Sequence, residues 1–231
     1  KPLCVTTDQL RAVQAAQAGS GGVLFVGYNR RYAPAAIGLR DFFLDAGEPL
    51  VQSYVVNAGY VPPNHWVHAP EEGGGRIVGE MCHFLDLMQY VSGEAATDVM
   101  ARRISAPGAH AVANDNVVLS FSFAQGSVGT VAYSGGGDRS APRETLNVFG
   151  AGRIGTIVDF KTLTTFRGGK QRRRRSMRQE LGYVEEMRRF IEAAGRGRAD
   201  SMPLEHVWAS TAGVFAAVQS LSSGTPMAVR W

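Results

Sequence analysis

Leu119-Ser120-Phe121-Ser122-Phe123 alternates apolar and polar side chains, and this stretch decides the class of fold. Successive side chains of a β-strand point to opposite faces, so the alternation predicts a strand with one buried and one polar face. Nearly all of the chain from about Thr97 to Arg167 follows such a pattern, and turn signals at residues 124–126, 135–137 and 150–152 predict hairpin connections. We therefore expect a large, mostly antiparallel sheet.

The start of the chain follows the order helix, strand, helix. Thr6-Thr7-Asp8 offers residues that cap a helix N-terminus, and the helix they begin is expected to end at Gly19-Ser20-Gly21-Gly22. The apolar run from Val23 to Val26 is interpreted as a buried parallel strand. A second helix is predicted from about Ala33 to Leu44, with Pro34 in its first turn. This order is typical of α/β proteins and is similar to the closing section of a doubly wound domain.

Helices are also predicted on both sides of the strand-rich region. Val51–Asn57 is predicted as a strand and Ala58–Glu72 as an irregular segment, after which Gly73-Gly74-Gly75 opens a helix. Two helices at the end of the chain each carry an apolar stripe, the first formed by Leu181, Val184, Met187, Phe190, Ile191 and Ala194. The predicted fold class is α+β: a large, mostly antiparallel, open-faced sheet with helices on one face, preceded by a remnant of a doubly wound α/β domain.

The composition excludes several classes of protein. The chain has 231 residues, of which 45% are hydrophobic and 19% charged, a balance typical of globular domains. Only Cys4 and Cys82 are present, too few for a disulfide scaffold, and two thiols fit a reducing cytoplasm. No apolar run approaches the roughly 20 residues of a membrane span. The net charge of +4 is too mild to indicate a nucleic-acid or membrane partner.

The helix that follows the three glycines carries the sharpest candidate for chemistry. Glu80 and His83 are three residues apart, as are His83 and Asp86, so all three can share one polar face. A histidine between carboxylates can be held in one tautomer with a tuned pKa, as a general acid or base requires. The alternative is a helix packed on a sheet, with His83 satisfied by an ordinary hydrogen bond.

The segment from Asn57 to His68 concentrates aromatic rings, hydrogen-bond donors and imidazoles in a loop. Tyr60 and Trp66 offer faces on which a sugar ring can stack, and His65 and His68 offer polar partners. Zinc ligation by the histidines is conceivable, but no set of four ligands has metal spacing. We therefore predict a sugar-binding loop and no metal site.

Three basic segments each leave two interpretations open. Asn29-Arg30-Arg31-Tyr32 follows an apolar strand, where α/β sheets bind ligands, so its arginines either grip a carboxylate or phosphate or cap a surface turn. Lys1 alone is most simply a solvated charge at a strand end. The run Arg172-Arg173-Arg174-Arg175, followed by Arg178, is interpreted as a solvated loop between the last strand and a helix, with nucleic-acid or phosphoanion binding as the alternative.

Four segments follow one another in an order that is typical of one family. Lys1-Pro2 is similar to the end of a Glu-Lys-Pro motif, and residues 26–32 to a strand-end arginine segment. Residues 73–86 are similar to a glycine-rich helix that bears a histidine, and residues 220–226 to a C-terminal helix-and-turn signature. Together they resemble the glucose-fructose oxidoreductase/inositol dehydrogenase/rhizopine-catabolism (Gfo/Idh/MocA) family of oxidoreductases, and its C-terminal substrate domain in particular.

The resemblance implies hydride transfer between NAD or NADP and a hydroxyl-bearing carbon of a sugar, polyol or sugar derivative. It implies that Lys1 orients the reacting hydroxyl and the nicotinamide and that His83 exchanges the proton, with Glu80 as a third candidate catalytic residue. Lys1, Pro2 and Arg30 are the candidates for cofactor contacts. The candidates for substrate binding are Asn29, Arg30, Tyr60, His65, Trp66 and His68.

The sequence departs from the family pattern in two respects. Many members carry an aspartate four residues before the histidine, where this chain has Gly79. Glu80 is no simple replacement, because one residue along a helix turns the side chain by about 100°. In addition, no Gly-x-Gly-x-x-Gly follows a strand near the N-terminus.

We therefore expect residues 1–30 to be the C-terminal remnant of a Rossmann dinucleotide-binding domain and residues 31–231 to be the substrate and oligomerisation domain. NAD or NADP would be bound mainly by the absent N-terminal half, so the chain alone is expected to be inactive. A cytoplasmic homo-oligomer formed through the open sheet face is predicted, with no nucleic-acid or membrane partner. The alternative function is a non-catalytic binding or oligomerisation module of the same fold.

Overall fold

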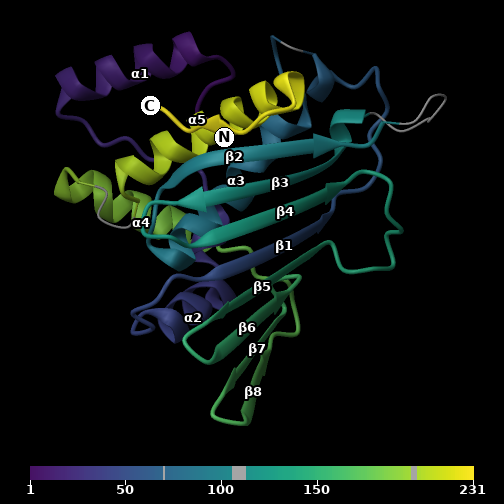
Figure 1. Ribbon diagram of the computed structural model, residues 1–231. Coiled ribbons are helices and arrows are strands. Elements are labelled where there is room, and N and C mark those ends of the chain that lie inside the picture. Colours follow the sequence, from purple (N-terminus) through teal and green to yellow (C-terminus); the bar gives the residue numbers. More distant parts are fainter. Residues whose placement is uncertain (70, 106–112, 199–201) are drawn as a thin grey trace.

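The computed structural model describes residues 1–69, 71–105, 113–198 and 202–231 (Figure 1). Its centre is a nine-stranded sheet in the order β8-β7-β6-β5-β1-β4-β3-β2-β9. The strands are β1 Val51–Asn57, β2 Ala96–Arg103, β3 Asn116–Phe123, β4 Val128–Ser134, β5 Glu144–Gly150, β6 Arg153–Val158, β7 Thr162–Arg167, β8 Lys170–Arg175 and β9 Met227–Ala228. All neighbouring pairs are antiparallel except β1 and β4.

Helices cover one face of this sheet and leave the other open (Figure 1). They are α1 Thr7–Ser20, α2 Pro34–Phe43, α3 Gly75–Ser92, α4 Tyr183–Arg196 and α5 Leu204–Ser223, with short 3-10 helices η1 Asn29–Tyr32, η2 Trp66–His68 and η3 Ala113–Asp115. The residues of α3 that form its predicted apolar stripe are all buried, namely Ile77, Met81, Phe84, Leu85 and Met88. The predicted α+β class with an open, mostly antiparallel sheet is confirmed.

The connection after β4 differs from the predicted hairpin. The turns at residues 124–126 and 150–152 do join the neighbouring strands β3–β4 and β5–β6. Residues 135–137, however, begin a crossover, because β1 lies between β4 and β5 in the sheet. The strand β1, from much earlier in the chain, thus lies between two strands that were expected to be neighbours. Local turn residues contain no information about such an insertion.

Two other predicted elements also differ. Val23–Val26 forms no strand, although Val26 is buried, because none of the strands in the described residues lies beside it. The arginine run forms the edge strand β8 rather than a loop. Gly168 and Gly169 have φ angles of 57° and 71°, which suits the two-residue turn that pairs Arg167 with Lys170.

The apolar stripe of α4 is helical as predicted apart from Leu181, which precedes the helix, but most of its side chains are exposed within the described residues, although Phe190 packs against Phe25. Val184 is 86% exposed and Ile191 is 69% exposed, and Met187 is exposed as well. The helix packs against η1 through its N-terminus, where a side chain on Gly182 would overlap the backbone of Asn29 and Ala33. None of the described helices is long and apolar enough to cross a membrane.

Two consecutive arginines of η1 tie these layers together through buried ion pairs. Arg31 donates two hydrogen bonds to the carboxylate of Asp86 on α3, with Nε 2.9 Å from Oδ2, and both side chains are fully buried. Arg30 donates to both carboxylate oxygens of Glu144 on β5, at 2.8 and 2.6 Å. The hydroxyl of Tyr54 on β1 also donates to Glu144, at 2.6 Å. One short segment therefore connects the helix layer to the middle of the sheet.

Removing one partner of a buried ion pair leaves the other charge buried and unpaired, which destabilises the fold. The contribution of the Arg31–Asp86 pair to stability can therefore be tested by removing Asp86. We expect Asp86→Ala to lower the free energy of unfolding by about 3–5 kcal/mol. Asp8→Ala, which removes the partner of Arg11 in an exposed pair, should change it by less than about 1 kcal/mol. Urea denaturation of both variants measures the difference, and equal unfolding midpoints would contradict a structural role for the buried pair.

Candidate active site

Lys1 lies against the N-terminal half of α3, the helix that carries the predicted catalytic residues Glu80 and His83. The Lys1 ammonium donates a hydrogen bond to the backbone carbonyl of Gly79, the position where the family resemblance leads us to expect an aspartate. Burial lowers the pKa of Lys1, and the charges of Arg30 and Arg143 lower it further, while Cys82 and Glu80 act in the opposite direction. Lys1 is therefore a partly desolvated amine held at one end by the helix backbone.

His83 lies beside Lys1 and is 7% exposed. Its ring meets the ring of Tyr28 edge to face at 6.2 Å. Burial lowers its pKa well below 6.5, and the positive charges of Arg30 and Lys1 add to this effect. Its Nδ1 is buried and has no hydrogen-bond partner among the described residues. A neutral imidazole with an unused nitrogen can exchange a proton with a bound group.

Glu80 belongs to the same cluster, but its carboxylate is directed toward arginines rather than toward His83. It accepts a hydrogen bond from Nε of Arg76 at 3.3 Å and lies 3.8 Å from Nη2 of Arg143. Asp86, the other carboxylate predicted beside His83, is engaged by Arg31 instead. The predicted histidine flanked by two carboxylates is therefore not formed, because both acids have arginine partners.

The charge of Arg30 acts on His83. Burial alone would lower its pKa, but the hydrogen bonds and the charge of Glu144 outweigh that effect and raise the pKa. Its guanidinium also lies 5.1 Å from the centre of the Phe84 ring, next to His83 on α3. Arg30 thus remains charged and contributes a fixed positive charge near His83.

Arg143 and Glu144 are site residues that the sequence did not point to. Arg143 is exposed and lies between two carboxylates, 3.8 Å from Glu80 and 3.9 Å from Glu144. Both residues reach the site because β5 runs next to β1, and that neighbourhood depends on the unpredicted crossover. The two residue types do not by themselves indicate a functional site, since an Arg-Glu pair at the start of a strand is common on protein surfaces.

The aromatic loop between β1 and α3 is anchored to α3 by Arg76. This buried arginine donates to the carbonyl of Gly59 at 2.6 Å and to that of Ala58 at 3.3 Å. Asp115 on η3 lies 3.4 Å from Arg76 and 3.8 Å from Nε2 of His68. A side chain on Gly73 would overlap the backbone of Val67, so the glycine run allows the loop to approach the helix closely.

Among the described residues, no hydrogen bond or ring contact joins the remaining predicted substrate-binding residues to Lys1 or His83. Tyr60 and Trp66 are 56% and 60% exposed, and Nδ1 of His65 accepts a hydrogen bond from the backbone of Val67 at 3.3 Å. Asn29 is buried and donates to the carbonyl of Leu181 at 2.8 Å, which is a structural contact. Pro2 is half-buried and follows Lys1 directly. Among the described residues, no group of three or more metal-ligating side chains is found.

Because the environment of His83 lowers its pKa, its imidazole should remain neutral down to pH 6 and below. We expect its ring resonances, assigned by their loss in His83→Asn, to keep constant chemical shifts between pH 8 and pH 6 in two-dimensional NMR spectra. A titration of these resonances with a midpoint above 6.5 would show that the nearby carboxylates, and not burial, dominate the site.

Comparison with known proteins identifies part of the chain. Residues 46–152 match the model of the GFO/IDH/MocA C-terminal domain, a segment that includes Glu80 and His83. The 1,5-anhydro-D-fructose reductase of Ensifer adhaerens is 29% identical over 133 residues, which cover 55% of this chain and 40% of that protein. The chain thus spans less than half the length of this curated relative.

Solved structures share the fold over nearly the whole chain. An aldose-aldose oxidoreductase from Caulobacter crescentus, complexed with glycerol, superposes with a TM-score of 0.82 at 17% identity, covering 99% of this chain and 70% of that one. Levoglucosan dehydrogenase in complex with NADH and levoglucosan gives a TM-score of 0.79 at 17% identity, covering 100% and 72%. The family match and the shared fold agree with the motif order along the chain. Residues 46–152 therefore match the C-terminal domain of the GFO/IDH/MocA family, and nearly the whole chain shares the fold of these solved oxidoreductases.

Proposed function

We propose that this chain is the catalytic part of an NAD(P)-dependent oxidoreductase that acts on the CH–OH group of a sugar, polyol or sugar derivative. The observation that carries the proposal is the placement of Lys1 beside the neutral, partly unsatisfied His83. The names of the relatives support the substrate class, since they describe a reductase of an anhydro sugar, a dehydrogenase in complex with levoglucosan and an aldose-aldose oxidoreductase in complex with glycerol.

In the proposed mechanism the two side chains divide the work of binding and proton transfer. The Lys1 ammonium donates a hydrogen bond to the reacting oxygen and so orients the carbon that bears it. His83 exchanges the hydroxyl proton through its imidazole, which must be neutral to accept it. Bound NAD or NADP supplies the hydride acceptor or donor.

We also propose a division of the chain into two functional parts. Residues 1–30, including Lys1 and Pro2, complete a nucleotide-binding domain that holds most of the cofactor, with Arg30 at its border. Residues 31–231 form the substrate and oligomerisation domain. We expect the enzyme to work in the cytoplasm.

The catalytic proposal predicts a specific effect of replacing His83 in the protein that carries both domains. We expect His83→Asn to lower kcat by about 10²- to 10⁴-fold, the range typical of lost general acid–base catalysis, and to leave the affinity for NADH within twofold. Initial rates with NADH or NAD and a panel of aldoses and anhydro sugars give kcat, and nicotinamide fluorescence gives the affinity.

His65→Asn serves as the matched control, because this exposed imidazole does not contact Lys1 or His83. It should retain full turnover. Turnover retained in His83→Asn would refute the proposed role of this residue. NADH binding without turnover of any sugar would favour the non-catalytic alternative, which the glycine at position 79 also supports.

We propose that the chain assembles with further copies through the open face of the sheet. Five exposed apolar side chains lie opposite one another in register across β7, β6, β5, β1 and β4 and form one continuous row: Phe166, Ile154, Phe149, Val51 and Val128. An apolar row of this length on an otherwise open sheet is typical of a buried interface.

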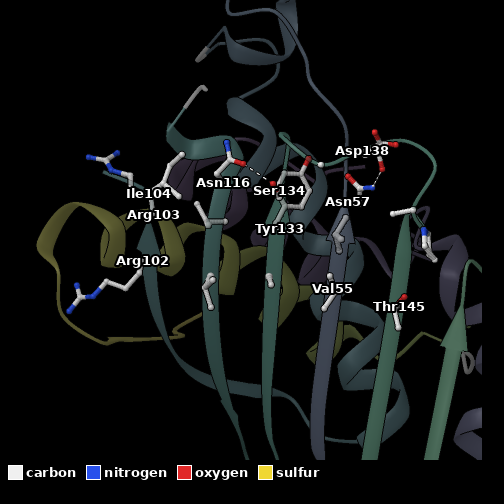
Figure 2. Close-up of a pocket in the computed structure, with 17 residues that line it drawn as sticks. Val55, Asn57, Arg102, Arg103, Ile104, Asn116, Tyr133, Ser134, Asp138 and Thr145 are labelled. Atoms are coloured by element: carbon white, nitrogen blue, oxygen red, sulfur yellow. Dashed lines mark hydrogen bonds between the residues drawn. The ribbon is translucent and has the colours of Figure 1, made fainter. Parts of the chain in front are cut away.

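A hollow on the same face, reached at Val55 farther along β1 from Val51, strengthens the proposal. The hollow has a volume of about 700 Å³. Figure 2 shows residues that line it, among them Val55 and Thr145 on neighbouring strands. The crossover loop borders it and is held in place by Asn57, whose amide donates to the carbonyl of Asp138 at 2.6 Å. A protruding side chain of a second copy can therefore enter a preformed apolar pocket.

Placing a charge in the apolar row should separate the copies. We expect Phe149→Glu to reduce the molar mass measured by light scattering to that of a monomer, because a carboxylate at the centre of the interface would be desolvated. Leu44→Glu, at an exposed apolar residue after α2, should leave the mass unchanged. An unchanged mass in Phe149→Glu would place the interface elsewhere or show that there is none.

A further inference from the structure

The positive charge of the chain is concentrated at one edge of the sheet. Residues 167–175 contain six of the 24 basic residues and no acidic one, which leaves 18 basic against 20 acidic residues in the rest of the chain. These residues form the end of β7, the Gly-Gly turn and β8, at the border of the sheet (Figure 1). The net charge of +4 is therefore a property of this hairpin.

The strand register divides these cations between the two faces of the sheet. Lys170, Arg172 and Arg174 lie opposite Arg167, Thr165 and Leu163, and Leu163 is buried on the helix-covered face. Arg173 and Arg175 lie opposite Thr164 and Thr162 and therefore point to the open face. The helix side thus carries four cations of the hairpin and the open side two.

The cations on the helix side line a groove between the hairpin and α2. This groove has a volume of about 420 Å³ and contains Arg167, Lys170, Arg172 and Arg174 together with one acidic residue, Asp41. Gly38 on α2 faces this groove, since a β-carbon there would lie 3.0 Å from Cδ2 of Leu163 and in ordinary contact with Nη1 of Arg174 at 3.9 Å. No ion pair within the described part of the chain engages these four cations.

We propose that this cationic groove binds a small anion with two or more adjacent phosphate groups, such as a diphosphate. Guanidinium groups match phosphate oxygens in bidentate geometry, and four converging cations with a single acid can neutralise more than one phosphate. The volume lies within the range of about 300–1,000 Å³ of small-molecule sites. A long polyanion such as DNA would use the cations of both faces, whereas the groove collects those of one face only.

The proposal is independent of the dehydrogenase function, since the groove shares no residue with the Lys1–His83 cluster. It can be tested by titrating the folded chain with inorganic pyrophosphate in a calorimeter at low salt. We expect binding that Arg172→Gln/Arg174→Gln weakens by roughly tenfold or more, the effect of losing two charge-assisted contacts. Asp41→Asn should strengthen it, because the only acidic group in the groove is removed.

Arg173→Gln/Arg175→Gln is the matched control, because it removes the same charge from the same strand on the opposite face. It should leave the affinity for pyrophosphate within twofold, and circular dichroism should show that both double variants are folded. Equal losses in the two double variants would overturn the proposal in favour of nonspecific charge attraction. Absence of binding at millimolar pyrophosphate, or binding of a DNA duplex that pyrophosphate does not displace, would overturn it as well.

Discussion

The double ion pair made by two consecutive arginines is the interaction on which the rest of the structure depends. Arg31 reaches Asp86 on α3, and Arg30 reaches Glu144 on β5, so η1 is fixed to the helix layer and to the sheet at once. Buried charges are costly unless they are paired in good geometry, and both pairs are hydrogen-bonded through two oxygens. His83 lies on α3 between these anchor points, so its position follows from the same contacts.

The same pairs determine the charge around the candidate site. Arg30 is held charged by its pair with Glu144, and Glu80 is engaged by two arginines. Among the candidate catalytic residues, Lys1 and His83 are therefore the groups left to exchange a proton. At position 79 a carbonyl oxygen contacts Lys1 in place of a carboxylate. A carbonyl accepts a hydrogen bond but does not take up a proton near neutral pH, so proton transfer in this chain depends on His83 more than in a site with an aspartate there.

Periodicity predicted most helices and strands, because each buries a local apolar pattern that can be recognised without its neighbours. It failed where the outcome depends on distant segments. Val23–Val26 resembles a strand but has no strand beside it among the described residues, and residues 135–137 resemble a hairpin turn although β1 separates the flanking strands. Helical spacing singled out Glu80 and His83, and the position after an apolar run singled out Arg30. Lys1 was added by the family resemblance, whereas Arg143 and Glu144 needed the strand order. The spacing of residues along the helix also could not predict that Asp86 pairs with Arg31.

The arginines of β8 and the apolar row of the open face together favour assembly by stacking of sheets rather than by joining their edges. An uncovered edge strand can pair with a strand of another molecule, and a row of cations on that strand opposes such pairing because two copies repel each other. The apolar row ends at Phe166 on β7, next to this charged edge. Protection of the edge explains why β8 carries cations on both faces. It does not explain why four cations of the hairpin line a groove beside α2, and that excess on the helix side is the feature for which an anionic ligand is required.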